Sequence, residues 1–414
     1  MNYKKLLLDR LLDRYEKSRS YSQQTISNRR IMVKLLQGDF PEYNVEKTDV
    51  RETINSVIQE CASRELVEYS WLKHEKGNII EKVWLRLDSL EKAYSDISRT
   101  PKGDIVGDIL AMVIKAQNEV KSDWINKYLR DLRARLELKR SARPFLPDDV
   151  SYARSVFIVL KSIDKIGQEE CLERVFSQKC FGDSKFFEKT VKKKVAGIIR
   201  KYLGHDSPDM EYLTDDEVLC SVGIVKAPEL FDFCGNLTVN VRNQTFDFSP
   251  FIYGVTINSK TAAEMEIIDL VSVKRILFIE NKANYLDYLN NKKKPDELIV
   301  YHGGFYSPVK GNFFRKLYQA GVNAGVEFYH WSDIDLGGFN IFVRLRENII
   351  PQLRPYLMDE EAFTLKVHRG MSFDGRYALL LEELLKKPEY KIFHPVIKLM
   401  LQNRLRIEQE VYIY

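Results

Sequence analysis

At 414 residues the chain is too long for one ordinary hydrophobic core, so we expect two or three domains. Its 44% hydrophobic and 30% charged residues exclude wholesale disorder, and a net charge of +5 permits a polyanionic partner without requiring one. The five scattered cysteines form no Cys-x-x-Cys pair typical of zinc or redox sites, and no run approaches the roughly 18 unbroken apolar residues of a membrane span. We therefore expect a cytoplasmic protein.

Residues 1–95 combine helical and β-strand patterns. Apolar residues recur at helical spacing over residues 3–17 and 50–64. Two β-rich runs, 66–72 and 79–87, then flank a polar turn, which predicts a hairpin. Helices followed by such a hairpin suggest a winged-helix-like arm domain, and any small α+β domain that ends in a hairpin fits equally well.

Residues 96–147 are expected to form a charged helical connector, which ends at Pro144 and Pro147. Its last helix alternates basic residues with an apolar face made of Leu129, Leu132, Leu136 and Leu138. A basic helix face can follow a phosphate backbone, and we take Arg133 and Arg140 as candidate DNA contacts. A solvated charged face is the commoner alternative.

Residues 148–258 open with helical stretches and a lysine-rich segment, and they turn β-like after Pro228. We expect a helical, winged-helix-like DNA-binding domain here. Lys185 and Lys193 are its candidate DNA contacts, chosen by charge alone.

Residues 259–414 change to short buried strands that alternate with helices. Apolar runs at 274–280, 296–302 and 326–331 read as strands, and a helical stretch follows each of them. Continuous apolar strands separated by helices predict a mainly parallel sheet covered on both faces. The chain as a whole is thus predicted to be a multi-domain α+β protein that ends in an α/β domain.

Three carboxylates follow the strands of this predicted sheet. Glu280 ends the first strand, and Asp333 and Asp335 follow the third. Functional groups collect at the carboxyl ends of parallel strands, so we expect the three to converge. Asp-x-Asp in an extended segment presents two oxygen ligands to one side, as a hard cation such as Mg²⁺ requires. These residues are our candidate metal and catalytic site, suited to phosphodiester chemistry.

Other interpretations of the same residues are open. Asp335, and Ser332 or Asp333, can instead be N-caps of the helix that follows. The Asp-x-Asp pattern of Asp333 and Asp335 can also be read as the motif of haloacid-dehalogenase phosphatases or of sugar transferases. In the phosphatases that motif ends the first strand of the fold, whereas here it follows the third predicted strand. His302 and His330 also end strands, and without His-rich spacing they favour a structural or positioning role over zinc ligation.

The order of these residues resembles the Toprim domain of topoisomerases, primases and related nucleases. In detail the chain resembles the JetD family, the nuclease subunits of Wadjet plasmid-defence systems. The segments that carry the resemblance are FGDSK (181–185), IENKANYLDYL (279–289), VYHGGFYSP (300–308), FYHWSDIDLGGFNIFVRLR (328–346) and RIEQE (406–410). The resemblance is specific from about residue 170 onward and general before it.

The resemblance implies a homodimer that binds Mg²⁺ or Mn²⁺ through Glu280, Asp333 and Asp335. It also implies cleavage of double-stranded plasmid DNA presented by an SMC-like ATPase, a kleisin and a small winged-helix subunit. Glu408 and Glu410 lie in the last matching motif, and a site role and a solvated helix face are both open for them.

Two further functions are weighed against this nuclease. The family is distantly similar to the A subunit of topoisomerase VI, which uses a tyrosine nucleophile. Tyr152 is the nearest candidate by position, but its neighbours do not match that pattern. A non-catalytic winged-helix DNA-binding protein, whose acids only cap helices, is the other alternative.

Overall fold

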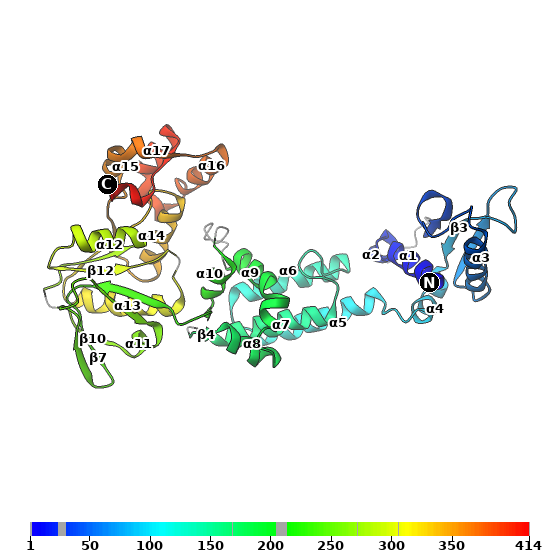
Figure 1. The fold of residues 1–414 in the computed structure, drawn as a ribbon, viewed down its shortest axis with the longest axis horizontal. Coiled ribbons are helices and arrows are strands. Elements are labelled where there is room, and N and C mark those ends of the chain that lie inside the picture. The colour runs from blue at the N-terminus through cyan, green and yellow to red at the C-terminus, as the bar shows by residue number, and fades with distance from the viewer. Residues whose placement is uncertain are drawn as a thin grey trace. The chain divides into compact units, whose positions relative to one another are not determined.

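The computed structural model describes residues 2–23, 30–167, 169–203, 213–270, 272–304 and 306–413. Contacts divide the chain into two compact units, Met1–Ile158 and Val159–Tyr414, which run from blue to green and from green to red in Figure 1. The fold is mixed α+β, as expected. Within the described ranges no helix has both the length and the apolarity needed to cross a bilayer.

The first unit opens with two helices on a small sheet. α1 (Tyr3–Glu16) and α3 (Thr48–Ser63) bury their apolar faces in one core with a three-stranded sheet of order β1-β3-β2. β2 (Val67–Trp71) and β3 (Ile80–Leu85) pair antiparallel, which confirms the expected hairpin. β1 (Met32–Lys34) pairs antiparallel with β3 and completes the sheet.

The connector region is helical, but its apolar face is narrower than expected. Leu129, Leu132 and Leu136 are buried, whereas Leu138 is 71% exposed. Leu138 lies two positions beyond Leu136, and residues two apart do not share a helix face. The remaining helices of this unit are α2 (Arg19–Gln23), α4 (Leu90–Asp96), α5 (Lys102–Glu119), α6 (Asp123–Lys139) and α7 (Val150–Ile166), the last of which continues into the second unit.

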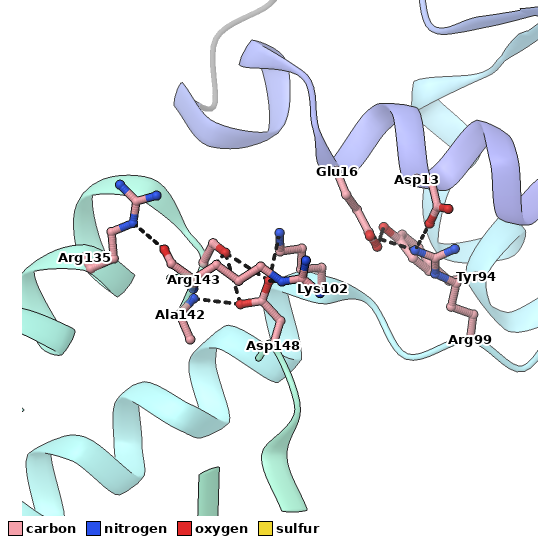
Figure 2. A network of polar contacts seen from close by, with 10 residues as sticks. Asp13, Glu16, Tyr94, Arg99, Lys102, Arg135, Ala142, Arg143 and Asp148 are labelled. Carbon is pink, nitrogen blue, oxygen red and sulfur yellow. Dashed lines mark hydrogen bonds and ion pairs between the residues drawn. The ribbon is translucent and has the colours of Figure 1, made fainter. Parts of the chain in front are cut away.

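Charge pairs join distant segments of the first unit (Figure 2). The Arg99 guanidinium lies 2.7 Å from the carboxylates of both Asp13 and Glu16 on α1. The Asp148 carboxylate lies 3.2 Å from Lys102 Nζ. Ion pairs therefore link the start of the connector region to α1 and the residue after its end to Lys102, all within the first unit.

The second unit begins with helices around a buried lysine. Lys192 Nζ lies 2.7 Å from the Glu173 carboxylate and 2.6 Å from that of Asp216, so it joins three helices. This lysine is structural, and the neighbouring Lys193 is exposed. The elements here are β4 (Cys171–Leu172), α8 (Glu173–Phe181), a π-helical turn (Phe187–Val191), α9 (Lys192–Tyr202), α10 (Asp215–Cys220) and β5 (Ile224–Val225).

The main sheet of the second unit has six strands in the order β14-β13-β11-β12-β6-β9. β11 (Arg275–Ile279), β12 (Glu297–Tyr301) and β13 (Glu327–Trp331) match the three predicted strands and pair in parallel. The sheet is mainly parallel, as predicted. Two antiparallel strands from before residue 259 extend it. The other strands are β6 (Leu230–Cys234), which lies next to β12, and the two edge strands β14 (Arg354–Pro355) and β9 (Val255–Asn258).

The other elements of this unit surround the main sheet. A second, antiparallel sheet has the order β10-β7-β8. Its strands and the helices of the sheet region are β7 (Thr238–Val241), β8 (Gln244–Asp247), β10 (Glu266–Asp269), α11 (Ser259–Glu264), α12 (Lys282–Asn291), α13 (Pro308–Asn323) and α14 (Leu336–Asn348). The last part contains α15 (Glu360–Lys366), β15 (Met371–Ser372), α16 (Gly375–Leu384), α17 (His394–Asn403), β16 (Leu405–Arg406) and a 3-10 turn (Gln409–Tyr412).

Helices cover both faces of the main sheet, and Figure 1 shows α12 and α13 on opposite sides of β12. Trp331 of β13 points to one face, where its ring contacts Tyr288 of α12. The preceding residue, His330, points to the other face, where its ring contacts Phe342 of α14. The helix that follows β11, α12, therefore lies on one face of the sheet, and the helix that follows the neighbouring strand β13, α14, lies on the other. Their carboxyl ends form a topological switch point, the usual place of a binding site in such sheets.

Candidate metal centre

Two of the predicted acids lie at this switch point. Glu280 directly follows β11, and Asp333 lies two residues beyond β13. The parallel register pairs Ile279 with Trp331, and the Glu280 N–H donates to the Trp331 carbonyl at 2.9 Å. The strands therefore bring these two residues, 53 positions apart, to neighbouring strand ends, but Glu280 lies outside the carboxylate group that Asp333 joins.

Asp333 also meets two glutamates from the end of the described chain. Ligand oxygens of Asp333, Glu408 and Glu410 all lie within 4.8 Å of one another. Among the described residues no other set of three or more acidic, histidine or cysteine side chains is grouped in this way. Burial and the neighbouring Asp335 carboxylate raise the pKa of Asp333 to about 8.

This donor set fits a hard divalent cation. All three side chains offer carboxylate oxygens, which are the ligands that Mg²⁺ and Mn²⁺ prefer. The crowding of negative charge that disfavours ionised Asp333 is relieved when a cation shares the site. The cluster is therefore suited to Mg²⁺ or Mn²⁺, and its residues come from two segments far apart in sequence.

Asp335 has a different local role. It is the N-cap of α14, and its Oδ1 accepts a hydrogen bond from the Gly338 N–H at 2.8 Å. Its Oδ2 lies 3.7 Å from the Arg406 guanidinium. Burial raises the pKa of Asp335, and the cap and Arg406 oppose that rise. The capping alternative thus holds for Asp335 and not for Ser332 or Asp333, and Asp335 lies outside the three-carboxylate group.

Gln409 joins the two strand ends. Its Oε1 accepts from the Asn281 N–H at 3.0 Å, and its Nε2 donates to the Trp331 carbonyl at 3.1 Å. Its own backbone N–H donates to Asp333 Oδ1 at 2.6 Å, and its carbonyl accepts from Asn284 Nδ2 at 2.7 Å. Gln409 is fully buried. We did not single out this residue from the sequence, and the only signal was its place between two glutamates in RIEQE.

Glu408 and Glu410 flank this glutamine, and Glu410 is exposed on the 3-10 turn. Glu408 precedes the 3-10 turn, and its carboxylate lies 3.3 Å from the Arg406 guanidinium. Glu410 accepts a hydrogen bond from Asn281 Nδ2 at 2.6 Å. Both glutamates are therefore held beside the carboxyl ends of β11 and β13.

Glycines allow the backbone to approach closely around these acids. A Cβ on Gly338 would lie 2.2 Å from the Asp333 carbonyl oxygen and 2.5 Å from Ser332 Oγ, so a side chain cannot fit there. Gly304 has a φ of +67°, and a Cβ on it would lie 3.8 Å from Glu280 Oε1. The first glycine is required by packing, and the second by its left-handed backbone.

The two strand-end histidines belong to the core. His302 and His330 are fully buried, and their rings meet edge to face with centroids 5.2 Å apart. Burial lowers the pKa of His330 to about 3 and that of His302 well below its usual value. Both rings are therefore neutral at pH 7, and neither lies in the carboxylate cluster.

The candidate DNA contacts and the candidate nucleophile lie on other elements. Arg133 pairs with a glutamate four residues along α6, and Arg140 lies over a tyrosine ring. Lys185 and Lys193 are exposed in the second unit. Tyr152 lies on α7 in the first unit, whereas the acids belong to the second.

Comparison with known proteins identifies two similarities. Residues 236–413 match a family model described as Wadjet protein JetD, C-terminal. Over 418 aligned residues the chain is 30% identical to a protein named Wadjet protein JetD from Bacillus cereus (strain Q1). The alignment covers 100% of this chain and 99% of that relative.

Proposed function

The chain belongs to the JetD family of Wadjet proteins, and from this premise we propose that it is a metal-dependent DNA endonuclease of the Toprim type. One observation carries the proposal. The carboxylates of Asp333, Glu408 and Glu410 meet at the switch point of a mainly parallel sheet, where Glu280 follows the neighbouring strand. Such an acidic edge suits phosphodiester hydrolysis better than a purely structural role, because three carboxylates within 4.8 Å of one another repel one another unless a cation shares the site.

Each acid has a distinct part in the proposed mechanism. Asp333, Glu408 and Glu410 would hold the divalent ion, whose chemistry is to bind phosphate oxygens and stabilise the leaving oxyanion. Glu280, on the neighbouring strand end, would transfer a proton to or from the reacting water or hold a second ion. Asp335 would orient the motif through its cap and through its contact with Arg406.

The proposed substrate is plasmid or other foreign circular DNA. The chain would act in a Wadjet defence complex as a homodimer, with an SMC-like ATPase, a kleisin and a small winged-helix subunit as partners. The similarity of the chain to the Wadjet protein JetD of Bacillus cereus supports a place in a Wadjet system, and these specific partners are part of the proposal. In this role the exposed Lys185 and Lys193 are the candidate backbone contacts in the second unit, and Arg133 and Arg140 in the first.

The decisive experiment measures conversion of supercoiled plasmid by the purified chain with Mg²⁺ or Mn²⁺, alone and with its Wadjet partners. We expect a linear product without attached protein, and a loss of at least about 10²-fold in rate for Glu280→Gln. Glu327→Gln is the matched control, because Glu327 lies at the amino end of β13 and pairs with Arg354 at 2.7 Å. It should cleave at the wild-type rate.

Two other outcomes would replace the proposal. A product joined covalently to protein would indicate a tyrosine transesterase, and Tyr152→Phe would then be the next variant to measure. Equal inactivity of wild type and Glu280→Gln with every partner present, together with retained DNA binding, would indicate a non-catalytic DNA-binding protein.

A further inference from the structure

The side-chain amide of Gln409 forms hydrogen bonds between the ends of β11 and β13 that a backbone peptide group would otherwise form. The ladder between β11 and β13 ends where the Glu280 N–H donates to the Trp331 carbonyl. Beyond that point Asn281 is the N-cap of α12, and β13 has ended at Trp331, two residues before Asp333. The Gln409 amide bridges this gap, since it accepts from the Asn281 N–H and donates to the Trp331 carbonyl. An amide does both, and a carboxylate cannot donate.

The same residue also fixes an acid of the site. The Gln409 backbone N–H donates to Asp333 Oδ1 at 2.6 Å, which restricts the rotation of that carboxylate. The flanking Glu408 and Glu410 are placed by the same backbone segment, which is anchored where Ile334 and Ile407 exchange hydrogen bonds of 2.9 and 3.2 Å. A shift of this segment would therefore move three carboxylates together.

We propose that Gln409 is a positioning residue of the metal centre, which sets the spacing between Glu280 and the Asp333 cluster through its side-chain amide. The inference rests on the proposed function. It adds to the proposed site an uncharged, fully buried residue that would act by holding other groups in place. Groups that hold metal ligands in place commonly change metal affinity by about 10- to 100-fold when they are removed. The expected effect is therefore on metal binding and turnover rather than on the affinity for DNA.

The test uses the full chain and titrates Mn²⁺ by electron paramagnetic resonance in wild type, Gln409→Met and Asn340→Leu. Methionine has a similar length but forms neither hydrogen bond of the amide, and it keeps the backbone N–H that reaches Asp333. Asn340 is the matched control, because it is a buried amide of the same unit that accepts from the Tyr390 hydroxyl. Gln409→Glu is the second variant, which keeps the acceptor for the Asn281 N–H, loses the donor to Trp331 when it is ionised, and adds a negative charge beside the cluster.

We expect the dissociation constant for Mn²⁺ to rise about 10- to 100-fold in Gln409→Met and to stay unchanged in Asn340→Leu. In plasmid cleavage kcat should fall while KM for DNA is kept. Thermal melting identifies which variants fold. If Gln409→Met does not fold, the same measurements are made on Gln409→Glu.

Two results would overturn the inference, and they differ from failure of the proposed function. If wild type binds Mn²⁺ and Glu280→Gln abolishes cleavage, but a folded Gln409 variant binds Mn²⁺ and cuts like wild type, then only the positioning role is wrong. A loss of Mn²⁺ affinity equal to that of Asn340→Leu would also reject it. If wild type neither binds Mn²⁺ nor cuts DNA with its partners, the proposed function fails and the positioning role fails with it.

Discussion

The two edges of the central strands surround their carboxylates with different groups. At the amino edge, Glu297 of β12 is paired with Arg275 of β11 and accepts hydrogen bonds from the Tyr288 hydroxyl at 3.1 Å and the Lys294 N–H at 2.9 Å. At the carboxyl edge, Asp333 lies among other carboxylates, and burial together with these charges raises its pKa. The comparison separates a structural acid that is paired with a cation of the chain from an acid that lies within 4.8 Å of two other carboxylates, an arrangement suited to binding a cation.

Breaking the amino edge should have the largest effect on stability. Arg275→Met leaves Glu297 buried without its cation, because Glu297 is 1% exposed. Removing one partner of a buried ion pair costs about 3 kcal/mol of unfolding free energy or more. Chemical denaturation with a fixed slope measures the change. The structural role of the Arg275–Glu297 pair is wrong if Arg275→Met is as stable as wild type. The separation between the two edges is wrong if the Mn²⁺ affinity of the folded variant falls.

Neutralising Asp333 at the carboxyl edge should raise the stability of the folded protein rather than lower it. The pKa of Asp333 is raised in the folded state, so the stability that this group contributes is present below its usual pKa and is lost as pH rises toward 8. In EDTA, we expect Asp333→Asn to be more stable than wild type by about 2 kcal/mol at pH 8 and by less at pH 5. Melting curves across this pH range are the measurement. A destabilised Asp333→Asn at pH 8 would show that the cluster is compensated.

Substitution of Asp335 should have the smallest effect, and it separates capping from charge. Asparagine is as good an N-cap as aspartate, so Asp335→Asn should keep its stability within a few tenths of a kcal/mol, whereas Asp335→Ala should lose about 1 kcal/mol. Denaturant midpoints decide between these values. If both variants lose the same stability, the contact with Arg406 matters more than the cap.

The sequence predicted the parts of this site that depend on local patterns. Apolar runs identified the three parallel strands, and the carboxyl-end rule placed Glu280 and Asp333 at neighbouring strand ends. The same reasoning included Asp335 among the ligands, which stays a prediction; the structure shows that one of its oxygens also caps a helix. A cap and a ligand have the same local sequence signal, so spacing alone did not separate them.

The sequence by itself determined the strands, their order along the chain and the type of residue at their ends. Only the tertiary structure decided that β6 and β9 extend the sheet and that the segment of Glu408, Gln409 and Glu410 returns to the ends of β11 and β13. The reason is the range of the interactions. Strand and helix patterns arise from neighbouring residues, whereas the Gln409 hydrogen bonds join positions 78 and 128 residues apart, and no local periodicity encodes such a pairing.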